Sequence, residues 1–145
     1  MKKSVLVTGI TLVLILAIAA ACGSKNGSSG RVPTGKVIKT AAVGNLTATL
    51  SSGTGQLKQG DQEVTLSFTD ASGKPVEVGA VSLNFHMPAH GGMAAMNDAV
   101  TLTTTSTPGV YRGKVKIGMA GEFQAQLAYE GAAGTGKTTF SVTAQ

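Results

Sequence analysis

From Asn45 to the end of the chain, apolar and polar residues alternate with a period of two. Successive side chains of a β-strand point to opposite faces of a sheet, so such a pattern buries one face and leaves the other in water. The apolar positions predict seven short strands, near residues 46–50, 64–68, 81–85, 100–104, 111–117, 123–129 and 140–142. This pattern favours an all-β fold, an immunoglobulin-like antiparallel β-sandwich.

The breaks between the predicted strands carry turn-forming residues, as in DASGKP at 70–75 and TPG at 107–109. One break, GAAGTGKT at 131–138, matches the phosphate-binding pattern GxxxxGK[ST] letter for letter. That motif needs a helix to follow the loop. Only the strand-like TFSVTAQ follows it, so we expect a Gly-rich hairpin loop and no bound nucleotide.

The N-terminal segment has the pattern of an export signal. Lys2 and Lys3 precede an uncharged apolar stretch at 5–21, which ends in small residues before Cys22. Cys22 stands where a bacterial lipoprotein signal places its acylated cysteine, although Ala19 replaces the usual Leu. We expect a lipid on Cys22. The alternatives are ordinary cleavage that leaves a free thiol, and an uncleaved anchor.

These features divide the chain into three parts: a lipoprotein signal peptide at 1–21, a flexible Gly/Ser-rich tether at 22–44 and a folded domain at 45–145. The lipid would hold the domain at the extracytoplasmic face of the cell membrane or outer membrane. Loss of the two signal lysines would lower the formal charge from +5 to +3, with ten basic against seven acidic residues. No basic cluster with interleaved aromatic residues remains, so we expect no nucleic-acid partner.

Histidine and methionine are concentrated in one segment. Residues 86–96, HMPAHGGMAAM, hold both histidines and three of the four methionines that follow the initiator. The fourth lies in a predicted turn at 118–121. In an up-and-down sandwich both connections emerge at the same end, so these side chains can gather there. The candidate metal ligands are His86, Met87, His90, Met93, Met96 and Met119.

The residue types in this segment favour copper. Thioether sulfur selects Cu(I), and imidazole also suits copper. Zinc is less suited, because it prefers Cys, His and carboxylate, and only two histidines with Asp98 are at hand. Pro88 and the Gly91–Gly92 pair disfavour a helix, so we expect ligands on a loop. The alternative is that the methionines only pack over the open end of the sandwich, since Met fills irregular gaps.

Residues 81–127 resemble the YtkA-like domain, which is related to FixH-like proteins. The resemblance rests on FHMPAHGGM at 85–93 and on PGVYRGKVKIGMAGEF at 108–123. The positions that correspond to the family's pattern are Met87, Pro88, His90, Met93, Met119 and Gly121. One departure is Phe123, because members commonly carry Trp at that position.

The resemblance implies a small extracytoplasmic β-sandwich, often lipid-anchored or fused to metal-efflux components. FixH-like relatives are tied to the assembly of haem–copper oxidases, which implies a metal-efflux or oxidase-assembly complex as partner. We therefore expect a lipid-anchored envelope domain that binds copper as a carrier, buffer or accessory. The alternative is a metal-free interaction module. The seven acidic residues are scattered and form no nucleophile–base set, so we expect no enzyme.

Overall fold

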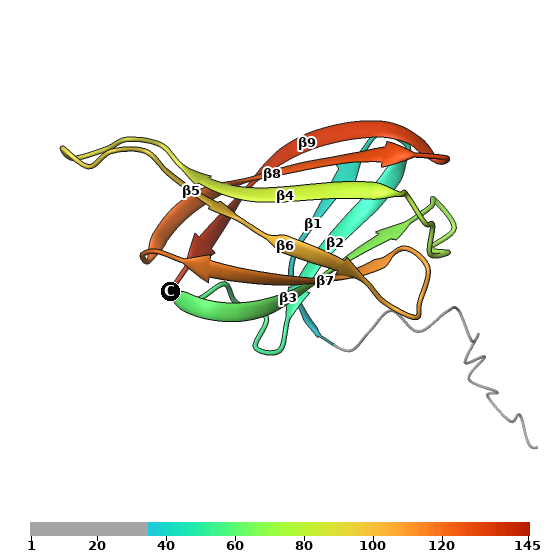
Figure 1. Ribbon diagram of the computed structural model, residues 1–145, viewed down its shortest axis with the longest axis horizontal. Coiled ribbons are helices and arrows are strands. Elements are labelled where there is room, and N and C mark those ends of the chain that lie inside the picture. The colour runs from blue at the N-terminus through green and yellow to red at the C-terminus, as the bar shows by residue number, and fades with distance from the viewer. Residues whose placement is uncertain (1–34) are drawn as a thin grey trace, which may run out of the picture.

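A computed structural model describes residues 35–145, which form β-strands in two antiparallel sheets (Figure 1). The first sheet has the order β1-β2-β3-β7-β6 and the second has the order β5-β4-β8-β9. The strands are β1 (Lys36–Val43), β2 (Leu46–Ser52), β3 (Gly60–Thr69), β4 (Ala80–Met87), β5 (Met96–Ala99), β6 (Thr101–Thr104), β7 (Val110–Ile117), β8 (Gly121–Gly131) and β9 (Gly134–Ala144). The predicted all-β antiparallel sandwich is thereby confirmed.

The predicted signal peptide, Cys22 and the first part of the predicted tether lie outside the described residues. None of residues 35–145 is helical, and this part of the chain therefore holds no helix able to cross a membrane.

The sandwich begins earlier than predicted, because residues 36–43 form β1 rather than part of a tether. This strand pairs with β2 from Lys36 opposite Ser52 to Val43 opposite Leu46. A register shift between Val37 and Lys39 breaks the alternation, and only Val43 of the strand is buried. The strand therefore lacks the period-two pattern by which the others were predicted.

The apolar faces of the two sheets meet in one core. Phe68, Phe85 and Phe123 are its largest fully buried side chains, and each is 0% exposed. Phe68 packs edge-on against Tyr111 and Tyr129, with ring centroids 5.9 and 5.6 Å apart. Such aromatic pairs prefer this arrangement because the positive edge of one ring faces the negative face of another.

One segment passes from the second sheet to the first. β5 pairs with β4, β6 pairs with β7, and only Val100 separates β5 from β6. The Val100 N–H donates a hydrogen bond to the Leu83 carbonyl (2.9 Å), which holds the crossing point against β4. The sequence pattern predicts only the β6 part, since β5 has four residues and none of them is fully buried. β5 completes a hairpin with β4.

Two predicted turns take the expected form. Gly131 lies opposite Gly134, so the segment with the phosphate-loop pattern is the hairpin between β8 and β9. At the other turn, Asp70 Oδ1 accepts hydrogen bonds from the Ser72 hydroxyl and from the backbone N–H groups of Ser72 and Lys74. These bonds, the Ser72 hydroxyl first, hold the pKa of Asp70 below its ordinary value because they favour the charged carboxylate.

Candidate metal centre

The hairpin of β4 and β5 extends beyond the body of the sandwich (Figure 1). Its strands pair up to Met87 opposite Met96, and the same register continues to an isolated bridge between His90 and Met93. Every residue from 88 to 95 is exposed. We call residues 88–95 the finger. The predicted Met/His loop is thus an ordered hairpin with a defined register.

A tight turn fixes the tip of the finger. The His90 N–H donates to the Met93 carbonyl (3.2 Å), and the Met93 N–H donates to the His90 carbonyl (2.8 Å). The two residues between them, Gly91 and Gly92, have φ of 53° and 81°. Positive φ at both central positions defines the type I′ turn, which matches the twist of a two-residue hairpin. Glycine adopts positive φ readily, so Gly91 and Gly92 suit the two central positions of this turn.

Pro88 explains why the ladder is interrupted between the base and the tip. Hydrogen-bonded pairs alternate along antiparallel strands, so the next such pair after His90 and Met93 joins Pro88 to Ala95. Proline has no N–H to donate, and residues 88–89 and 94–95 are accordingly not paired as strand. The tip is therefore a separate closed turn at the end of a looser stem.

The hairpin separates the predicted ligands onto two faces. Met87 points into the core and is 3% exposed, whereas His86 lies on the outer face. Met96 lies directly opposite Met87 and packs against the core, as does Met119. Three of the methionines therefore lie on the inner side.

The inner methionines meet at the turn between β7 and β8. A Cβ at Gly118 would lie 2.5 Å from Met96 Cε, and a Cβ at Gly121 would lie 2.7 Å from Met87 Cε. Met119 belongs to this same turn, and Asp98 ties the turn to β5 by accepting a hydrogen bond from the Gly118 N–H (3.1 Å). The topology thus gathers Met87, Met96 and Met119 at one end of the sandwich. All three side chains are buried or partly buried and pack with the hydrophobic core.

His86 is held on the outer face of the second sheet. Its Nδ1 lies 2.9 Å from the side-chain oxygen of Asn97, which also accepts a hydrogen bond from Asn84. Because an amide oxygen can only accept, Nδ1 carries the proton in this hydrogen-bond network. The Nε2 lone pair of His86 is then directed away from Asn97.

His90 has the same arrangement at the tip. Its Nδ1 lies 2.9 Å from the Pro88 carbonyl, which can only accept, so Nδ1 is the donor and Nε2 keeps its lone pair. Metal-binding histidines commonly donate their other ring N–H to a backbone carbonyl, which fixes the ring and its tautomer. Pro88 therefore has two effects, since it opens the ladder and orients the imidazole.

His90 also borders a small cavity of about 270 Å³ beside the finger. The cavity is lined by Met87, Pro88, His90, Glu122 and Gln124. Glu122 and Gln124 come from β8, where Gln124 lies opposite His86. The sequence does not single out these two residues, because only the pairing of β4 with β8 brings them near the finger.

At the tip, a histidine and a methionine are paired across the turn. His90 and Met93 are a hydrogen-bonded cross-strand pair, so their Cα atoms are about 5.5 Å apart and their side chains share one face. Met93 is 43% exposed, in contrast to the buried Met87. We call these two residues the tip pair. Because they share one face, His90 Nε2 and the Met93 sulfur are the candidate ligand atoms at the tip.

The six predicted ligands therefore do not form one cluster. Met87, Met96 and Met119 lie inside, His86 lies on the outer face, and His90 and Met93 form the tip pair. Among residues 35–145 there is no group of three or more His, Cys, Asp or Glu side chains that could hold a metal ion.

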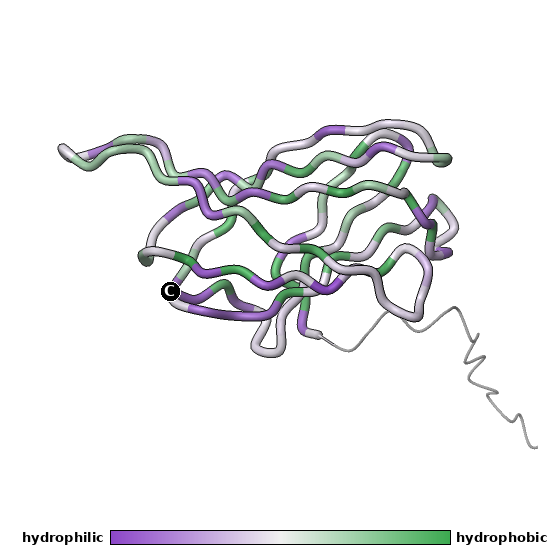
Figure 2. Tube along the Cα trace, viewed as in Figure 1, coloured by the Kyte–Doolittle hydropathy of each residue, from purple (hydrophilic) through white to green (hydrophobic). Residues whose placement is uncertain are grey.

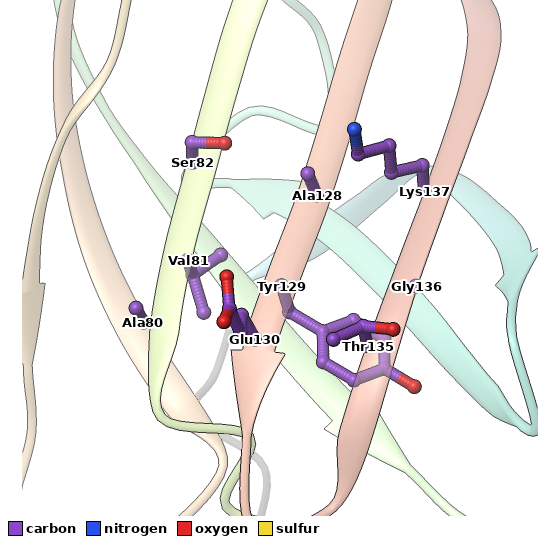
Figure 3. Close-up of a pocket in the computed structure, with 9 residues that line it drawn as sticks. All are labelled: Ala80, Val81, Ser82, Ala128, Tyr129, Glu130, Thr135, Gly136 and Lys137. Atoms are coloured by element: carbon purple, nitrogen blue, oxygen red, sulfur yellow. The ribbon is translucent and has the colours of Figure 1, made fainter.

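A larger hollow, of about 650 Å³, lies on the outer face of β4, β8 and β9 (Figure 3). It is near Ala80, at the end of β4 away from the finger. Ala128 and Glu130 come from the middle strand, β8, and Lys137 comes from β9. No imidazole or thioether lines it, so its chemistry differs from that of the finger.

The fold and the finger define a small β-sandwich protein that displays an exposed Met/His hairpin at one end. The chain belongs to the YtkA-like family, whose match covers residues 40–128 and so includes the finger and the Met119 turn. The predicted resemblance is confirmed. No curated protein and no solved structure matches the chain.

Proposed function

We propose that this protein binds copper at the cell envelope, where a lipid on Cys22 anchors it, and that the tip pair takes the metal as Cu(I). The observation that carries the proposal is the juxtaposition of His90 and Met93 across the closed turn. Soft thioether sulfur selects Cu(I) and carries no proton to lose, and imidazole is a compatible ligand.

The geometry of His90 supports this choice. Its ring is already oriented by the Pro88 carbonyl, so little side-chain freedom is lost when Nε2 binds a metal. Met93 is exposed although it is a large apolar side chain, and packing does not account for its position. A metal ligand on a protruding turn accounts for both features.

The exposure of the finger suits a carrier, buffer or accessory more than a storage site. A metal held at the tip is open to ligands from another protein, so it can be exchanged without unfolding the sandwich. Metal-efflux and oxidase-assembly complexes are the partners that this role would serve.

A metal-free interaction module is the second candidate. The finger is exposed throughout and holds no Asp, Glu, Lys or Arg, as suits an adaptable apolar contact. Its methionine would then serve as a flexible contact rather than a ligand. This candidate predicts a partner that binds through the finger equally well with and without copper.

Titration of the full chain with Cu(I), under anaerobic conditions and against a chromophoric Cu(I) chelator, tests the proposal. We expect binding of no more than one ion per chain. Met96→Leu and Met119→Leu should leave the affinity unchanged within about threefold, because these residues pack and the exchange conserves volume. A chain that fails to compete with a weak chelator would contradict the proposal and favour the interaction module.

A further inference from the structure

The tip pair is an incomplete coordination shell. It offers one nitrogen and one sulfur, whereas Zn²⁺, which has the same filled d shell as Cu(I), is commonly held by four ligands in a tetrahedral arrangement. The other soft ligands of the hairpin are turned away, because Met87 and Met96 pack toward the core. Two positions on a metal at the tip are therefore left for ligands from outside the finger.

The finger is built so that a second molecule can approach it closely. All of residues 88–95 are exposed, and the turn projects beyond the sandwich (Figure 1). Figure 2 shows the finger mostly in white and pale green, since it consists of Pro, Ala, Gly and Met apart from one His. Two fingers that meet tip to tip would bring no like charges together.

We propose that two copies of the protein share one Cu(I) ion, each supplying His90 Nε2 and Met93 sulfur. This inference rests on the proposed copper binding at the tip pair. A two-fold axis through the metal makes the two tips equivalent, as in the closed symmetry of most homodimers. A second copy of the protein supplies the same two ligand types in the same geometry. The four positions on the metal are then filled by two nitrogens and two sulfurs.

The dimer should exist only while the metal is bound. Two fingers of eight residues each fall short of the roughly 20–30 residues a side that specific, stable interfaces use. The metal–ligand bonds must therefore supply the association. The copper content of the protein, rather than its concentration alone, would then set the balance between monomer and dimer.

Sedimentation velocity of the full chain, in detergent with micelles in large excess, tests the inference when Cu(I) is added anaerobically in steps. We expect the protein mass of the sedimenting species to double at half an equivalent of copper and to fall back as copper exceeds one equivalent. A Cu(I) chelator should restore the monomer. Met93→Leu should remain monomeric throughout, whereas the matched exchange Met96→Leu should behave as the unchanged protein.

Two other results would be distinguishable. One copper bound per monomer at every ratio would overturn the shared site and leave the proposed function standing. If Glu122→Gln then abolished this binding, the missing ligand would come from the same chain through the cavity beside His90. A chain that binds no copper would overturn both the inference and the proposed function.

Discussion

Replacing Phe68 by alanine is expected to lower the free energy of unfolding by about 3–5 kcal/mol, which is the usual cost of removing a buried phenylalanine. The ring is 0% exposed and packs edge-on against Tyr111 and Tyr129, which come from different sheets. The substitution therefore removes apolar burial and two aromatic contacts at once, and it leaves a cavity where the sheets meet.

Urea denaturation followed by circular dichroism measures this effect. Val37→Ala is a suitable control, because Val37 is 58% exposed and its loss should change stability by less than about 0.5 kcal/mol. If Phe68→Ala lowered the free energy of unfolding as little as Val37→Ala does, the two sheets would not pack as described.

The combined substitution of His90 and Met93 by alanine is expected to weaken Cu(I) binding by at least about 100-fold. Losing an outer hydrogen-bond partner of a metal ligand already costs roughly 10–100-fold, and here both ligands themselves are removed. Both side chains are exposed on a turn, so stability should be nearly unchanged.

The chain offers a matched control for this variant. His86→Ala also removes an imidazole whose Nδ1 is held by a neighbouring acceptor, but it does so on the outer face and not at the tip. It should leave the affinity for Cu(I) within about threefold of the unchanged protein. An equal loss in His86→Ala would show that the metal does not bind at the tip pair.

Most of the fold could be predicted because seven of the strands carry a clear alternation of apolar and polar residues. β1 was missed for a physical reason, since its register shift disrupts the period and a single residue of the strand is buried. One signal was present, because Gly44–Asn45 is a two-residue turn pair of the kind that joins hairpin strands. β5 was missed because it is short and runs into β6 across a single residue.

The candidate site could be predicted in part. The gathering of methionines at one end follows from counting strands, and Met87, Met96 and Met119 do meet around one turn. The sequence could not show that these three methionines are separated from His90 and Met93, because this separation depends on the register of β4 against β5. A shift of one residue in that register would exchange the inner and outer faces.

The central claim, that Cu(I) binds at the tip pair, is tested most directly by X-ray absorption at the copper edge of the Cu(I)-loaded protein. We expect a mixed shell of nitrogen and sulfur in equal numbers, together with the outer-shell scattering of an imidazole ring. A shell of sulfur alone would contradict it, because that result would place the metal among the inner methionines, Met87, Met96 and Met119.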